Sequence, residues 1–182
     1  MGSFFQLPEL GKWVGLAGGR RKPGPVEEVL EKLRMADGRW GTTTQAFDAR
    51  RVAGRVHLAH AARLALLFHS RGSGFADSLA AELVCWTAAD RQIRRALERV
   101  GLREDSRTVA LVSVGERRES VEGALGEIFG TGVVRREDGV MELSPSKRKA
   151  LLEAFSLSPS LVRKMGLERL VLEKVALLAL ER

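Results

Sequence analysis

Residues 108–114, Thr-Val-Ala-Leu-Val-Ser-Val, constrain the fold more than any other segment of this chain. The run is apolar and rich in β-branched side chains, which favour strands. It is shorter than an ordinary helix, and Gly115 closes it. A short continuous apolar run of this kind is typical of a strand that is buried on both faces. The sequence therefore predicts a sheet that contains this strand and is covered by other elements.

Two more segments are predicted to form strands, residues 12–17 and the threonine-rich residues 42–47. A loop rich in glycine and basic residues, 18–24, follows the first of them. Later in the chain, Asp138-Gly139 lies between the short stretches 133–137 and 140–143. An Asp-Gly pair flanked in this way is a strong signal for a β-hairpin.

Helices are predicted wherever apolar residues recur every three or four positions. These segments are residues 25–38, 54–71, 75–86, 87–100, 121–130 and 166 to the end, with helix starts also at Ser144-Pro145 and Ser158-Pro159. Strands and helices interleaved in this order indicate an α+β fold, a small mixed and largely antiparallel sheet packed by several helices. We expect one domain over residues 1–182, with a basic N-terminal strand and loop in 1–24 and the core in 25–182.

The helix predicted over residues 87–100 has well-marked ends. Thr87 and Asp90 are spaced as in a capping box, in which a threonine and an acidic residue satisfy the first backbone N–H groups. The helical periodicity then directs Ile93 and Leu97 inward. Gly101 is expected to end the helix in the left-handed conformation.

Composition excludes several classes of protein. Of the 182 residues, 45% are hydrophobic and 29% are charged, which is typical of one globular domain and excludes a wholly disordered chain. No stretch approaches the roughly 20 apolar residues of a membrane span, and the first residues do not form a secretory signal. Cys85 is the one cysteine, so no internal disulfide can form and zinc sites with several cysteines are excluded. We expect a cytoplasmic protein.

The positive charge is concentrated near the N-terminus. The chain has a net charge of +7, and the 12 basic and 6 acidic residues before Gly72 give +6 of it. Localised positive charge suggests a partner that carries phosphates or acidic groups. The alternative is that Arg20, Arg21 and Lys22 belong to a solvated loop. The sequence leaves both interpretations open.

No catalytic or cofactor-binding pattern is present. The glycine-rich residues 15–22 lack the register of a phosphate-binding loop, because Pro23 follows Lys22 where a serine or threonine is needed. His57 and His60 are spaced like a pair of metal ligands, but a buried histidine in a packing role is the more frequent case. Cys85 has no activating neighbour in sequence. We therefore expect no enzyme activity, no cofactor and no metal.

Two segments instead favour binding. Arg91, Arg94 and Arg95 are close in sequence and can share an exposed helical surface, where guanidinium groups pair with phosphates or stack on bases. The alternative is an ordinary surface with ion pairs to Asp90 and Glu98. The C-terminal helix carries leucines on more than one side, which indicates a central position in the core or a face shared with a partner.

Taken together, these landmarks resemble the small kinase-binding regulatory subunit of the KEOPS complex, which makes threonylcarbamoyladenosine on tRNA. The resemblance extends from about Val26 onward. The segments that carry it are Gln45-Ala46-Phe47-Asp48-Ala49, His57-Leu58-Ala59-His60-Ala61, Ser78-Leu79-Ala80-Ala81-Glu82-Leu83, Arg91-Gln92-Ile93 with Ala96 and Gly101, and Leu167-Glu168-Arg169-Leu170-Val171-Leu172-Glu173 followed by Val175-Ala176-Leu177-Leu178.

The resemblance implies a non-catalytic protein that binds and stimulates the small atypical kinase/ATPase of the complex. It also implies recruitment of tRNA through the 3′ CCA end and indirect contact with the catalytic subunit that transfers the threonylcarbamoyl group. We select Arg63, Arg71, Arg91, Arg94 and Arg95 as RNA-binding candidates and Leu170, Val171 and Lys174 as kinase-interface candidates. The alternatives are a stand-alone module for single-stranded RNA and an unrecognised nucleotide-using enzyme.

Overall fold

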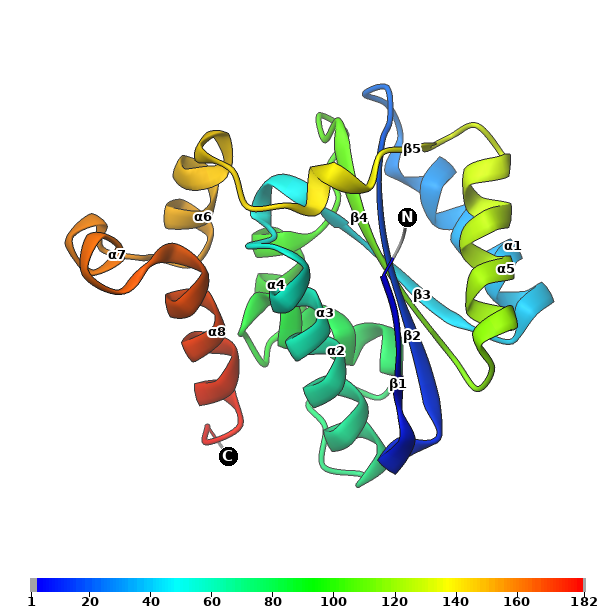
Figure 1. Ribbon diagram of the computed structural model, residues 1–182, viewed down its shortest axis with the longest axis horizontal. Coiled ribbons are helices and arrows are strands. Elements are labelled where there is room, and N and C mark those ends of the chain that lie inside the picture. Colours follow the sequence, from blue (N-terminus) through cyan, green and yellow to red (C-terminus); the bar gives the residue numbers. More distant parts are fainter. Residues whose placement is uncertain (1–2, 182) are drawn as a thin grey trace. The chain divides into compact units, whose positions relative to one another are not determined.

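The strand predicted from the apolar run, β4 (Thr108–Gly115), lies inside a five-stranded sheet in the computed structural model, which describes residues 3–181 (Figure 1). The strand order is β1 (Ser3–Leu7), β2 (Lys12–Arg20), β4 and β3 (Thr43–Asp48), and β5 (Arg135–Arg136) also pairs with β2. Every pairing is antiparallel. The predicted α+β class with a largely antiparallel sheet is confirmed.

The chain folds as two compact units, each made of two chain segments. The sheet unit comprises Met1–Ala49 and Leu102–Val140, and the helical unit comprises Arg50–Gly101 and Met141–Arg182. Each unit has its own buried core, so each is described separately. The expected single domain over residues 1–182 stays a prediction.

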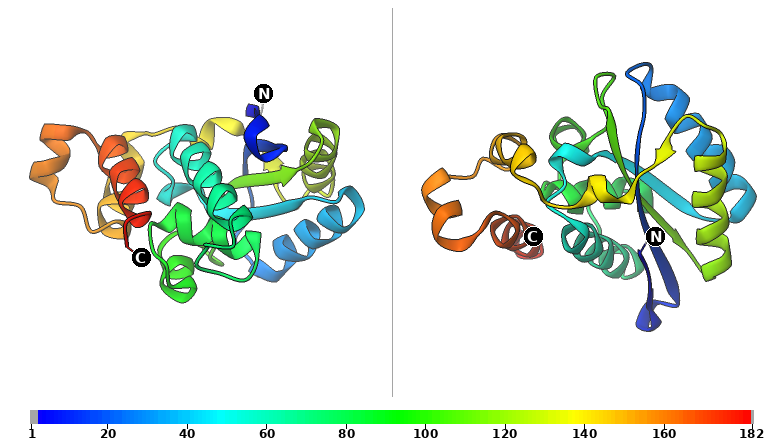
Figure 2. Two further views of the ribbon diagram at one scale, coloured as in Figure 1. Left: turned by 90° about the horizontal axis from the view of Figure 1, so that it is seen from below. Right: turned by 45° about the horizontal axis from the view of Figure 1, so that its top comes forward.

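Two helices, α1 (Val26–Trp40) and α5 (Arg118–Gly130), cover the same face of the sheet (Figures 1 and 2). Their apolar side chains form one buried cluster with residues of β2, β3 and β4. The close approach depends on Gly15 of β2, because a Cβ atom there would lie 2.6 Å from Cγ1 of Val121 and 2.9 Å from Cδ1 of Leu125. Burial of these apolar surfaces is the main term that stabilises the unit.

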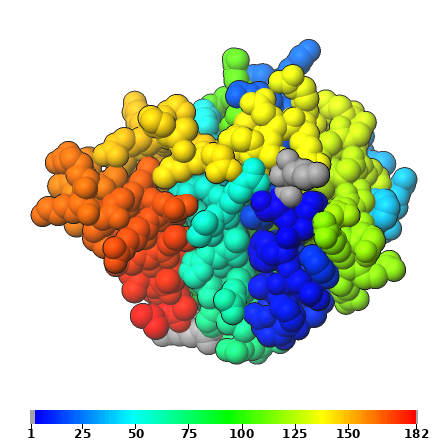
Figure 3. Space-filling model, in the orientation of Figure 1, coloured from blue at the N-terminus to red at the C-terminus, as the bar shows by residue number. Residues whose placement is uncertain are grey.

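The N-terminal region contains more strand than the sequence predicted. β1 was not predicted, and β2 continues through Gly18, Gly19 and Arg20, which pair with the first residues of β4. The predicted loop over 18–24 is therefore wrong for its first three residues. In the space-filling view, the start of the chain (blue) lies directly beside α5 (yellow-green) (Figure 3).

The predicted hairpin at Asp138-Gly139 does not form. Residues Asp138–Met141 make a 3₁₀ turn instead, and the only strand in this segment is β5. The cause is that Asp138 points to β2, where its Oδ1 atom accepts a hydrogen bond from the N–H of Gly18 at 2.9 Å. The N–H of Glu137 also donates to the carbonyl oxygen of Gly18 at 2.8 Å. These bonds tie the segment to β2 and leave no partner strand for a hairpin.

Six α-helices belong to the helical unit: α2 (Arg55–Ser70), α3 (Leu79–Ala88), α4 (Ile93–Val100), α6 (Arg148–Ala154), α7 (Pro159–Met165) and α8 (Leu167–Leu178). α3 packs on α2 and α4, while α8 packs on α2, α3 and α7. The space-filling view shows α7 (orange) and α8 (red) side by side (Figure 3). Trp86 is fully buried in the unit, and its ring stacks on Phe68 at a centroid distance of 4.8 Å.

The helix predicted from Phe75 begins only at Leu79. The preceding loop is held by the buried carboxylate of Glu82, which accepts a hydrogen bond from the N–H of Ala76 and another from Nε1 of Trp86 at 2.8 Å. Gly74 is required beside this carboxylate, because a Cβ atom there would overlap Oε1 of Glu82. The loop is therefore ordered by one acidic side chain rather than by helical bonds.

The capping box predicted from Thr87 and Asp90 is wrong. Thr87 belongs to α3, which ends at Ala88, and Ala89 has the left-handed φ of 51° that closes that helix. Asp90 instead accepts from the N–H of Gln92, so α4 begins at Ile93. At the other end Gly101 has a φ of −63°, so the predicted left-handed cap is also wrong.

Candidate functional site

The junction between α3 and α4 is organised by one buried carboxylate. The side chain of Asp90 is only 3% exposed and accepts from the N–H of Gln92 at 2.9 Å. It also accepts from Nε and Nη2 of Arg95 at 3.0 and 3.1 Å, and Nη2 of Arg99 lies 3.4 Å away. Burial alone raises the pKa of Asp90, but these donors outweigh burial and lower it, so the group stays ionised. The start of α4 is therefore fixed by four contacts to Asp90.

The outer face of α4 carries large apolar side chains. Ile93 is 40% exposed and Leu97 is 45% exposed, whereas the small Ala96 and Val100 are fully buried. This reverses the predicted inward direction of Ile93 and Leu97. The reason is that the buried side of α4 is centred on Ala96 and Val100, so Ile93 and Leu97 fall at the edge of the apolar stripe and stay partly exposed. Residues four apart share one helical face, so Ile93 and Leu97 form an exposed apolar pair.

The arginines predicted around this helix are all exposed, but they differ in their partners. Arg95 is engaged by Asp90, as the ion-pair alternative supposed. Nη1 of Arg91 donates to the carbonyl oxygen of Glu181 at 3.1 Å. Within residues 3–181, the side chain of Arg94 makes no hydrogen bond or ion pair. Arg94 is thus the member of the set whose donors are available to a partner.

Two further arginines, which were not among the predicted RNA-binding residues, also lie in this region. Arg51 donates through Nη1 to the carbonyl oxygens of Glu98 and Arg99, at 3.1 and 2.8 Å, at the end of α4. Arg51, Arg95 and Arg99 line an open cavity of about 320 Å³ together with Glu98, Glu153 and Ala154. Arg99 could have been found from its spacing of four residues from Arg95. Arg51 could not, because it lies far away in sequence.

The other two RNA-binding candidates belong to another helix. Arg63 is exposed on α2, and Arg71 is exposed directly after it. Both α2 and α4 pack on α3. The two groups of arginines therefore come from different helices of the helical unit, and their use as one RNA-binding surface stays a prediction.

The kinase-interface candidates lie mostly inside the helical unit. Leu170 is 8% exposed and Val171 is fully buried, while Lys174 is half-buried. The exposed apolar residues of this segment are Leu177, at 47%, and Leu180, at 78%. Leucines therefore extend from the core of the unit to its surface. Because Arg91 bonds to the backbone of Glu181, the end of α8 lies beside the start of α4.

His57 is a packing residue rather than a ligand. Its Nδ1 atom accepts from the N–H of Ala53 at 3.1 Å, so the ring proton is on Nε2, which donates to the carbonyl oxygen of Thr87 at 2.9 Å. Burial, together with nearby His60 and Lys147, lowers the pKa of His57 to about 4, although the bond to Thr87 acts in the opposite direction. His57 is therefore a buried packing residue, as the favoured interpretation supposed. Across residues 3–181, no group of three or more His, Cys, Asp or Glu side chains could hold a metal ion.

The one cysteine is not an activated nucleophile. Burial raises the pKa of the Cys85 thiol to about 11, and the carboxylates of Glu82 and Asp90 add to the effect. A nucleophilic cysteine needs the thiolate form near neutral pH. Cys85 therefore serves the apolar packing of α3.

Comparison with known protein families identifies what kind of chain this is. The family model for the kinase-binding protein CGI-121 matches residues 26–179. A search of curated proteins gives no match. No helix within residues 3–181 is long and apolar enough to cross a membrane. The matched family is one of kinase-binding proteins, which confirms both the suspected resemblance and the expectation of a non-catalytic chain. The match covers most of the sequence, and the chain therefore belongs to the CGI-121 family of kinase-binding proteins.

Proposed function

We propose that this protein is the regulatory subunit that binds the small atypical kinase/ATPase of a KEOPS complex and stimulates it. We propose further that it helps to recruit tRNA through the 3′ CCA end for the threonylcarbamoyladenosine modification at position 37. Contact with the subunit that transfers the threonylcarbamoyl group is then indirect, through the kinase. Membership of a kinase-binding family supports the first part.

The exposed pair Ile93 and Leu97 carries the proposal for kinase binding. Contact of these large apolar side chains with water is unfavourable, and a partner that covers them removes this cost. Exposed apolar groups beside arginines are typical of protein interfaces. Arg94 lies between them in sequence and has no partner within the described residues. Leu177 and Leu180, near the end of α8, extend the exposed apolar surface that we assign to the kinase.

The earlier kinase candidates have a supporting role in this proposal. Leu170 and Val171 are buried, so they hold α8 in place instead of touching a partner directly. Lys174 is half-buried and can do both. Substitution of Leu170 or Val171 is therefore expected to weaken kinase binding only together with loss of stability.

The RNA part of the proposal is supported by the exposed arginines of the helical unit. Single-stranded RNA ends are held by basic side chains and stacking surfaces, and guanidinium groups supply both. Arg63, Arg71, Arg91, Arg94 and Arg95 remain our candidates, with Arg94 the most available of them. Arg95 is held by Asp90. To bind RNA, it either breaks this ion pair or contacts a phosphate while the pair remains.

Titration calorimetry of the full-length protein with the KEOPS-type kinase tests the first part. The proposal expects a complex of micromolar affinity or tighter, and no heat at such concentrations overturns it. For the RNA part, binding of intact tRNA is compared with binding of tRNA that lacks its CCA end. Weaker binding of the truncated tRNA is expected, whereas equal affinities exclude recognition of the CCA end. RNA binding without a kinase complex favours the stand-alone RNA module instead.

A further inference from the structure

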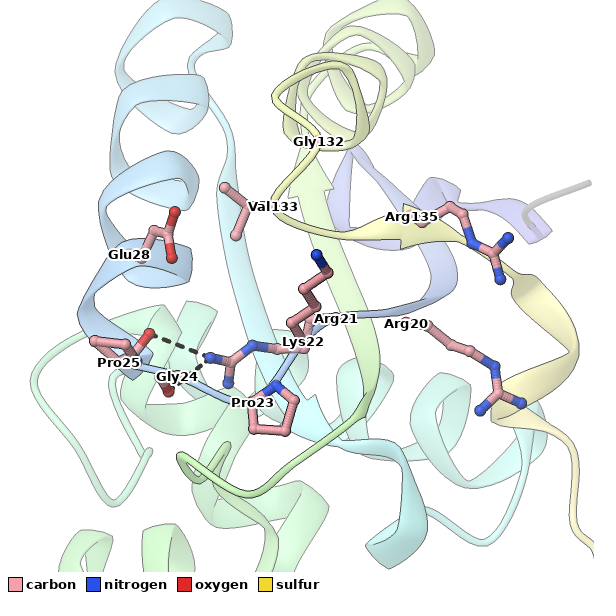
Figure 4. Close-up of a pocket in the computed structure, with 10 residues that line it drawn as sticks. All are labelled: Arg20, Arg21, Lys22, Pro23, Gly24, Pro25, Glu28, Gly132, Val133 and Arg135. Atoms are coloured by element: carbon pink, nitrogen blue, oxygen red, sulfur yellow. Dashed lines mark hydrogen bonds between the residues drawn. The ribbon is translucent and has the colours of Figure 1, made fainter.

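A second basic region lies in the sheet unit, where the end of β2 meets the start of α1. It is a cavity of about 540 Å³ whose walls come from residues 20–25, Glu28 and the segment that leads into β5 (Figure 4). The full lining is Arg20, Arg21, Lys22, Pro23, Gly24, Pro25, Glu28, Gly132, Val133 and Arg135. This is the same basic segment whose role the sequence left open.

The cavity is strongly positive. Four of its lining residues are cationic, and Glu28 is the single acidic one. Just outside the lining, Glu137 accepts from Nε of Arg20 at 2.8 Å and from Nη2 of Arg135 at 3.4 Å. One carboxylate is therefore shared by two arginines. Even with Glu28 and Glu137 counted, an excess of positive charge remains for an anion.

Arg21 gives the cavity its shape and a buried charge. It is only 8% exposed, and its guanidinium donates to three backbone carbonyls, those of Arg103 at 3.2 Å, Gly24 at 2.7 Å and Pro25 at 3.3 Å. Within residues 3–181 it forms no ion pair with a carboxylate. Burial of a charge without a counter-ion is unfavourable, so an anion that enters the cavity relieves part of this cost.

The cationic side chains spread along the cavity and do not converge on one point. Figure 4 shows Lys22 directed toward Gly132 and Val133, whereas Arg20 and Arg135 extend to the other side. One phosphate group cannot contact all of them. Successive phosphates of an extended chain can, and this is how single-stranded nucleic acids are bound along basic grooves.

We propose that this cavity binds backbone phosphates of RNA, as a contact separate from the arginines of the helical unit. The inference rests on tRNA being a partner, which is part of the proposed function. The basic residues 20–25 precede the residues matched by the family, 26–179. Three of its cationic residues, Arg20, Arg21 and Lys22, thus lie outside the matched range, whereas Arg135 lies within it.

The test compares charge reversals inside and outside the cavity. The variant Lys22→Glu/Arg135→Glu changes two exposed lining residues and leaves the structural Arg21 intact. The control Arg34→Glu/Arg117→Glu makes the same change in net charge at exposed positions outside the lining. Arg117 follows the end of β4 that pairs with Trp13, roughly 25 Å along β2 from Arg20.

Binding of intact tRNA is measured by fluorescence anisotropy over a range of salt concentrations, and protection of Lys22 from acetylation is measured by mass spectrometry. We expect the cavity variant to bind on the order of tenfold more weakly than the control, with a salt slope reduced by about two. We also expect tRNA to protect Lys22 in the wild-type protein better than inorganic phosphate or ATP at equal phosphate concentration.

If wild-type protein binds tRNA and the cavity variant binds it as the control does, the inference is overturned and the proposed function stands. Equal protection of Lys22 by phosphate or ATP also overturns the inference, because the site then takes free phosphates. If the wild-type protein binds no tRNA, the proposed RNA role fails, and titration with the kinase still tests the rest.

Discussion

Lowering the pH from 7.5 to 5.0 should destabilise the protein through His57. Its pKa is about 4 in the folded protein, against 6.5 for an exposed histidine, because the ring is buried and His60 and Lys147 lie nearby. The unfolded chain therefore binds more protons than the folded one between these values. The contribution of His57 to the free energy of unfolding is therefore fully present above pH 6.5 and is lost as the pH falls toward 4. These two pKa values give a loss of about 2 kcal/mol at pH 5.0.

Urea titrations followed by circular dichroism at the two pH values measure this loss. His57→Gln keeps one acceptor and one donor at this position but cannot be protonated, so its pH dependence should be smaller by most of that amount. His60 also has a pKa lowered by burial, so it adds a loss of the same sign in the wild type and in the variant. His69→Gln makes the same substitution on the same helix, away from Ala53 and Thr87, and is the matched control. A wild-type free energy that is flat across this range, or an equal slope in the His57 variant, refutes the reasoning.

Two further substitutions test the packing that positions the proposed surfaces. Asp90→Ala should cost about 1–3 kcal/mol in urea titrations, because the N–H of Gln92 loses its side-chain acceptor and the charges of Arg95 and Arg99 lose their carboxylate; a change below about 0.5 kcal/mol contradicts this role. Gly19→Ala should cost about 1–3 kcal/mol, because its Cβ atom would overlap Cγ1 of Val134 and lie 2.7 Å from the carbonyl oxygen of Arg135; a thermal midpoint equal to that of the wild type shows that this contact is not needed.

Local patterns in the sequence predicted much of the fold. The apolar run at 108–114 became β4, and the region after Gly54 became α2 with its predicted ends. Both depend on signals that act within a few residues, strand propensity and helical periodicity. The packing role of His57 was also predicted, and its buried ring bonds to Ala53 and Thr87.

Errors arose where a distant residue competes with a local signal. Asp138 has the residue type and the glycine neighbour of a hairpin turn, but its carboxylate bonds to the backbone of β2, far away in sequence. The start of α4 was misplaced because Ala89 adopts a left-handed conformation, which glycine or asparagine would have signalled and alanine does not. Ile93 and Leu97 share an apolar stripe with Ala96 and Val100, and only the tertiary packing of α4 decides that the two smaller residues take the buried side.

The candidate sites were predicted only in outline. The arginines near α4 were found from their spacing, but the sequence could not show that Arg95 is held by Asp90 while Arg94 is left without a partner among the described residues. The basic loop could not be distinguished from a solvated one until Arg21 was found buried against backbone carbonyls. Burial of this kind is a tertiary property and leaves no trace in local composition.

The most direct test of the account is the affinity of the kinase for the variant Ile93→Asp, measured by calorimetry beside wild type and the control Met35→Asp. Met35 is 52% exposed on α1, so the control places the same charge on a similarly exposed apolar residue of the other unit. We expect the Ile93 variant to fold with wild-type stability and to bind the kinase at least about 30-fold more weakly, as for an interface hot spot. Wild-type affinity of the Ile93 variant would contradict it.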